Sequence, residues 1–107
     1  MNKNERLAAL GLQAYAKVRQ LFAATDHADA VTQAMMFQKL LTRIVEGLRA
    51  SGLSDEQIVS VFKTAAEGFA ADTIERVEKR KSRKLSEEEI KEISNAVNAF
   101  FVETLVV

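Results

Sequence analysis

The sequence predicts an all-α protein in which four antiparallel helices form an elongated bundle. Three observations support this fold class: the chain lacks proline, it is rich in alanine, leucine, glutamate and lysine, and its apolar residues recur at three-and-four spacing. Its 107 residues, 48% hydrophobic and 28% charged, suit a single domain over 1–107 with a buried core. Helices of about 20 residues are roughly 30 Å long, so we expect an elongated molecule. Dimerisation would complete the bundle.

The first helix is expected over about 4–24. Its main apolar stripe follows helical spacing, and a second stripe of Leu12, Tyr15 and Phe22 lies beside it. The main stripe consists of Leu7, Leu10, Ala14, Val18 and Leu21. Thr25 or Asp26 then supplies the N-cap of the next helix.

The second helix is expected over about 28–50. Its apolar residues cover more than half of the circumference, which indicates neighbours on two sides. The central stripe is Phe37, Leu41, Ile44 and Leu48, and Val31, Met35, Met36, Leu40 and Val45 widen it. Gly52 is placed to end the helix in a Schellman motif, with Leu53 as its hydrophobic partner.

The third and fourth helices are expected over about 55–80 and 87–105. Each begins at a capping box, Ser54 with Gln57 and Ser86 with Glu89. Because no glycine or proline lies between Phe69 and the C-terminus, a single continuous helix in place of these two is the alternative. The apolar stripe lapses over 78–84, and a capping box has no use inside a helix, so we favour a break near 82–86.

Three glycines, Gly11, Gly47 and Gly68, fall inside the predicted helices. Each costs about 1 kcal/mol relative to alanine in a helix interior. Close approach of two helix backbones at a crossing would account for them, and a flexible hinge is the less favoured alternative.

A dense basic run is the sequence feature that could identify a partner. The candidate nucleic-acid contacts are Arg76, Lys79, Arg80, Lys81, Arg83 and Lys84. Clustered cations bind phosphates without reading bases. Cations at a helix end, followed by Glu87 to Glu89 at the next helix start, also complement two helix dipoles. No aromatic residue is interleaved, and 72–92 contains seven basic and seven acidic residues, so we favour the dipole interpretation.

The segment 48–62 weakly resembles the core of a helix-turn-helix, with Gly52 in the turn and Ile58 six residues later. The resemblance implies that the following helix enters the major groove of DNA. The segment departs from that pattern because Leu48 stands where a small residue is usual, and because the helix begins with acidic Asp55 and Glu56. An ordinary αα-hairpin accounts for the same residues.

The chain offers little to catalysis or metal binding. It has no cysteine and a single histidine, His27, which Asp26 and Asp29 flank. We predict that His27 is an exposed turn residue, because ligands so close in sequence rarely complete a coordination sphere. We therefore expect no catalytic residue, no metal, no cofactor and no small-molecule substrate, and predict that the protein is not an enzyme.

An apolar end to the last predicted helix is the candidate protein interface. Its residues are Phe100, Phe101, Leu105, Val106 and Val107. An apolar helix end must be covered by its own domain or by another chain. Met35, Met36 and Phe37 offer an alternative groove for a partner helix, although their spacing favours the core. We predict a small helical interaction or regulatory protein, a homodimer or a subunit with a protein partner, with nucleic-acid binding through 76–84 as the alternative.

The expected location is cytoplasmic, and no membrane partner is predicted. No stretch approaches the roughly 18 apolar residues of a membrane span. The first residues do not suit a signal peptide, because Glu5 interrupts the charged leader and helical periodicity continues to Phe22. The net formal charge is zero, so attraction to a polyanion would have to be local.

Overall fold

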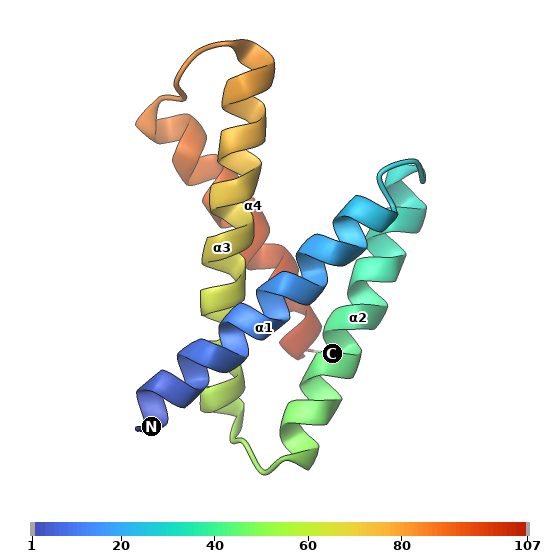
Figure 1. Ribbon diagram of the computed structural model, residues 1–107, viewed down its shortest axis with the longest axis vertical. Helices are drawn as coiled ribbons and strands as arrows, with labels where there is room; N and C mark the ends of the chain where they lie inside the picture. The colour runs from blue at the N-terminus through green and yellow to red at the C-terminus, as the bar shows by residue number, and fades with distance from the viewer. Residues whose placement is uncertain (1, 107) are drawn as a thin grey trace.

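The computed structural model describes residues 2–106, with side chains described as far as Glu103. It contains four α-helices, α1 (Lys3–Ala24), α2 (Ala30–Ala50), α3 (Asp55–Lys81) and α4 (Glu87–Val106), and no strand within those residues. Consecutive helices run in opposite directions (Figure 1). The predicted all-α bundle is therefore confirmed. The molecule measures 44 × 30 × 23 Å, and its radius of gyration of 14.4 Å exceeds the value of about 13 Å typical for this length.

Helix α3 lies at the centre of the bundle. It packs most extensively against α1, which crosses it obliquely, and against α4, while α2 makes smaller contacts with the other three helices. The last turns of α3 and the first turns of α4 extend beyond the other helices as a hairpin, at the top of Figure 1. We call residues 76–92 the α3–α4 hairpin.

The predicted N-cap at the junction between α1 and α2 is wrong. The carboxylate of Asp29 caps α2 by accepting a hydrogen bond from the Thr32 N–H at 2.7 Å, so neither Thr25 nor Asp26 is the cap. Thr25 is buried, and its hydroxyl donates to the carbonyl of Leu21 at 2.7 Å. Because Thr25 closes α1 in this way, α2 begins at residue 30 rather than 28.

The other predicted helix boundaries are confirmed. Gly52 has a φ of 92°, and the Leu53 N–H donates to the carbonyl of Leu48 at 3.2 Å, as a Schellman motif requires. Both capping boxes form: the Ser54 hydroxyl accepts from the Gln57 N–H at 3.2 Å, and the Ser86 hydroxyl accepts from the Glu89 N–H at 3.2 Å. Helices α3 and α4 are thus separate.

The core contains all six phenylalanines of the chain in one connected cluster. Phe22 of α1 stacks on Phe37 of α2 at a centroid distance of 6.0 Å, and Phe69 of α3 meets both rings edge-on. The remaining rings join the cluster through α3 and α4, at Phe62, Phe100 and Phe101. Every helix therefore contributes at least one ring, which holds the loosely packed α2 to the others.

Two of the three helical glycines lie at a helix crossing. A Cβ on Gly11 would lie 2.5 Å from the Cβ of Thr64, and one on Gly68 would lie 2.9 Å from the Tyr15 ring. Both glycines allow α1 to approach α3 closely. The same prediction for Gly47 is wrong, because a Cβ there would meet no atom within 4 Å.

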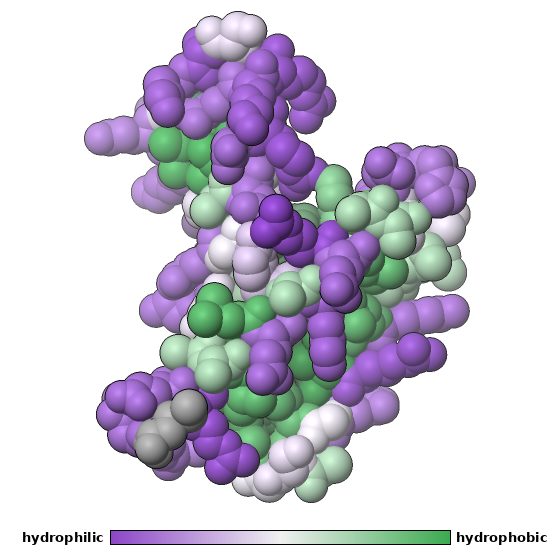
Figure 2. Space-filling model, in the orientation of Figure 1, coloured by the Kyte–Doolittle hydropathy of each residue, from purple (hydrophilic) through white to green (hydrophobic). Residues whose placement is uncertain are grey.

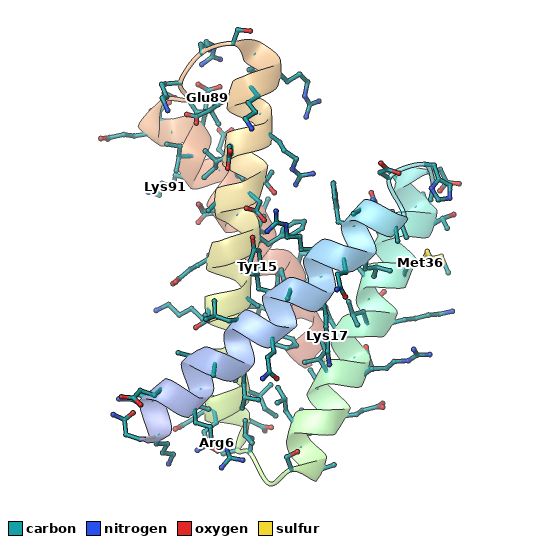
Figure 3. The ribbon with its side chains drawn as sticks, viewed as in Figure 1. Arg6, Tyr15, Lys17, Met36, Glu89 and Lys91 are labelled. Carbon is teal, nitrogen blue, oxygen red and sulfur yellow. The ribbon has the colours of Figure 1, made fainter. Side chains whose placement is uncertain are left out.

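The apolar arc of α2 is only partly covered. Phe37 is buried as predicted, but Met35 and Met36 are 55% and 41% exposed, so the prediction that they belong to the core is wrong. Val31 is 71% exposed, and on α1 Leu12 is 60% exposed. Met36 points outward from α2 (Figure 3). The reason is that α1 and α4 cover only one side of α2, which periodicity alone does not reveal.

Candidate interaction surface

The predicted basic residues of the α3–α4 hairpin are largely engaged by neighbouring acids. The Arg83 guanidinium donates to both carboxylate oxygens of Glu89, each at 3.0 Å, and Lys81 lies 3.5 Å from the same carboxylate. Lys84 lies 3.9 Å from Glu78. The hydrogen bonds from Arg83 hold the pKa of Glu89 well below its usual range. Opposite charges therefore neutralise each other across the turn, as the helix-end interpretation anticipates.

The remaining basic residues lie on the α3 side of the hairpin. Lys79 pairs with Glu75 at 3.2 Å, and Arg76 lies over the Phe22 ring of α1, 4.0 Å from its centroid. Arg80 is exposed and has no carboxylate within 4.0 Å among the described residues. The structure thus separates Arg76 from the turn that brings the other cations together.

The turn of the hairpin has its own structural support. Ser82 adopts a left-handed conformation with a φ of 55°, and the Leu85 N–H donates to Glu78 Oε2 at 2.9 Å. Leu85 is buried beneath the turn, although the sequence pattern did not single it out. Figure 2 shows a mostly hydrophilic surface over this hairpin, and Figure 3 places Glu89 within it. The basic run therefore lies in an ordered turn.

The predicted C-terminal interface is only partly compatible with the structure. Phe101 is 2% exposed and packs on Phe62 at a centroid distance of 5.8 Å, so its own domain covers it rather than leaving it available to another chain. Phe100 is half-buried and reaches Phe37 at 6.1 Å. The side chains of Leu105, Val106 and Val107 lie outside the described residues.

An apolar groove separates the first half of α2 from α4. It has a volume of about 310 Å³, and Phe37 and Phe69 are among its lining residues. Its lining also includes Ala30 and Ala34 of α2, and Ala96 and Phe100 of α4. The groove exists because three of these residues are alanines, whose side chains are too small to fill the space between two helices. No pattern in the sequence indicates this groove.

The groove continues into a second hollow on the same side of the molecule. This hollow, of about 380 Å³, is lined by exposed residues of α2 and by Glu103 of α4. Val31 and Met35 supply its exposed apolar side chains. We define the α2–α4 surface by its principal residues, which are Ala30, Val31, Ala34, Met35, Gln38, Phe100 and Glu103.

A part-buried contact between α1 and α3 contains a perturbed titratable group outside the hairpin. The Tyr15 hydroxyl donates to the Asp72 carboxylate where the two helices cross (Figure 3). This hydrogen bond raises the pKa of Tyr15.

Since α1 and α4 cover α3 on two sides, the geometry favours an αα-hairpin over the helix-turn-helix resemblance for 48–62.

The described residues contain no assembled metal site. His27 and Asp26 are both exposed, with their nearest atoms 3.7 Å apart, and no group of three metal-ligating side chains occurs in the part of the chain that the structure describes. None of the helices in that part has the length and apolarity needed to cross a membrane.

No protein-family model, curated protein or solved structure matches this chain. Function must therefore be inferred from its own residues and their geometry. One feature that the packing of the bundle leaves unexplained is the exposed apolar character of the α2–α4 surface.

Proposed function

We propose that the protein is a small non-enzymatic interaction module that works as a homodimer through its α2–α4 surface. The observation that carries the proposal is the exposure of Val31 (71%) and Met35 (55%) beside an apolar groove. Each square ångström of apolar surface removed from water contributes about 25 cal/mol, and contiguous exposed apolar patches mark contact sites. Covering this surface would therefore be favourable.

A second copy is the partner that this surface fits. In a two-fold dimer, one patch must be complementary to itself. Self-complementarity needs both a protrusion and a hollow. The α2–α4 surface offers both, because the exposed Val31 and Met35 stand beside a hollow between Ala34 and Phe100. Each copy could therefore bury its apolar side chains against the surface of the other.

The molecular mass in solution tests this proposal. We expect sedimentation equilibrium in the micromolar range to give the mass of a dimer for the wild-type protein. Met35→Glu should give a monomer, since it would bury an unpaired charge. Leu12→Glu is the matched control, because Leu12 is similarly exposed but lies on α1. A monomeric wild-type protein over the whole range would refute the proposal.

The proposal of a non-enzymatic role draws on the side chains present. The only histidine is exposed in a turn, and the chain has no cysteine to act as a nucleophile. The titratable pair Tyr15 and Asp72 links two helices where α1 crosses α3, and this link is enough to explain its geometry. A structural role therefore explains the perturbed groups without a reaction.

Nucleic-acid binding by the α3–α4 hairpin is the second candidate. It is favoured by the extension of the hairpin beyond the body and by the exposed Arg80. A fluorescence titration with duplex DNA at low and at physiological salt tests it, with Arg80→Ala as the variant and Lys17→Ala as the control. Salt-sensitive binding that Arg80→Ala weakens would support this function. An absence of binding at low salt would eliminate it.

A further inference from the structure

Two opposite charges border the exposed apolar residues of the α2–α4 surface. Met35 and Gln38 line two hollows, one of which also includes Glu103 of α4 and the other Lys39 of α2. Lys39 and Glu103 therefore lie on opposite sides of the Met35–Gln38 stretch. Neither has an opposite charge within 4.0 Å among the described residues.

We infer that a second copy docks on this surface with its two-fold axis along the Met35–Gln38 stretch, so that Lys39 of each copy pairs with Glu103 of the other. The inference rests on the proposed homodimer and names the contact that orients it. A two-fold axis in the plane of an interface brings residues on its opposite sides together. One cation and one anion in those positions make the surface complementary to itself.

The two symmetric ion pairs determine the orientation of the copies more than their affinity. Exposed ion pairs add little to affinity, whereas like charges placed opposite one another exclude the wrong arrangement. Apolar contact at Val31 and Met35 supplies the attraction. A dimer with one copy turned end over end would lose the pairing of Lys39 with Glu103.

Charge reversal at the two positions tests the pairing. Lys39→Glu places two glutamates at each contact of a homodimer, and Glu103→Lys places two lysines there. Each variant alone should dimerise about tenfold more weakly than wild type, since two attractive contacts become repulsive. An equimolar mixture of the two restores both attractive contacts, and should form a heterodimer with an affinity near that of wild type.

The measurement is sedimentation velocity with a fluorescent label on one variant, and Lys63→Glu on α3 serves as the matched charge control. Circular dichroism confirms that each variant is folded. Weak homodimers with a strong heterodimer would support the pairing. A wild-type dimer that neither reversal weakens, or variants that are weak both alone and mixed, would overturn the pairing and leave the homodimer standing. A monomeric wild type would refute the homodimer itself.

Discussion

Arg76 of α3 covers the ring of Phe22 on α1, with its guanidinium carbon 4.0 Å from the ring centroid. The same guanidinium donates to the Thr73 hydroxyl at 3.1 Å and lies 5.9 Å from the centre of the Phe69 ring. A side chain that the sequence offers as a phosphate contact thus also shields one edge of the phenylalanine cluster.

Replacement of Arg76 by alanine should lower the free energy of unfolding by about 0.5–1 kcal/mol, the usual contribution of an exposed cation–π contact. The alkyl part of the side chain also covers apolar surface. Urea unfolding measures the change. Lys79→Ala is the control, because Lys79 makes only an exposed ion pair. An equal loss in both variants would show that the contact with Phe22 contributes nothing of its own.

Tyr15 should titrate above its ordinary range, because its hydroxyl donates to Asp72 and this raises its pKa. A raised pKa means that the folded state holds the proton more tightly. The stabilisation is therefore complete below the unfolded pKa of about 10 and is lost as pH rises through the folded pKa. Because Tyr15 is the only tyrosine, the absorbance of its phenolate reports this titration directly.

The Asp72→Asn variant is the control for Tyr15, since it removes the charge and keeps the shape. Its tyrosine should titrate closer to the ordinary value. The alkaline loss of stability should also be absent from Tyr15→Phe, which has no proton to release. Titration of the wild-type tyrosine at its ordinary pKa would contradict the hydrogen bond as the cause.

Alanine at two glycines should have opposite effects on stability. Gly11→Ala should destabilise the protein by about 1–3 kcal/mol, because its Cβ would overlap Thr64 where α1 crosses α3. Gly47→Ala should stabilise it by up to about 1 kcal/mol, because the position is open and alanine favours helix. Thermal and urea unfolding of the pair give both values. A stabilising Gly11→Ala would mean that the crossing is looser than described.

Glycine at residue 82 should stabilise the α3–α4 hairpin. Ser82 has a φ of 55°, a conformation that costs an L-residue roughly 1 kcal/mol and glycine almost nothing. Ser82→Gly should therefore raise the free energy of unfolding by about 0.5–1 kcal/mol. Ser51→Gly is the control, because Ser51 ends α2 with a φ of −80° that any residue adopts. A gain at Ser51 as large as at Ser82 would exclude backbone strain as the reason.

Local signals predicted helix boundaries well because the atoms involved lie within a few residues of one another. The capping boxes at Ser54 and Ser86 and the Schellman motif at Gly52 all form as the sequence indicates. The start of α2 was missed because Asp29, a residue that can also cap a helix, follows the two predicted candidates, Thr25 and Asp26, within five residues. Only the tertiary position of Thr25, which is buried and bonded to α1, decides in favour of Asp29.

Properties that depend on which helices are neighbours could not be read from the sequence. The same apolar spacing places Phe37 in the core and leaves Met35 exposed, because none of the described helices covers that side of α2. The groove between Ala34 and Ala96 depends on the separation of two helices far apart in the chain. For the same reason, spacing gave no sign that Gly47 faces open space while Gly11 meets Thr64.

The phenylalanine cluster also leaves apolar surface uncovered while the chain is being synthesised. Phe22, Phe37 and Phe69 contact one another, yet Phe37 and Phe69 also pack against rings of α4 that the ribosome makes later. Until Phe100 and Phe101 have been added, the nascent chain carries these aromatic rings without their final cover. Uncovered apolar surface is what chaperones recognise and what drives aggregation. We therefore expect the growing chain to be most prone to aggregation after α3 has emerged and before α4 docks.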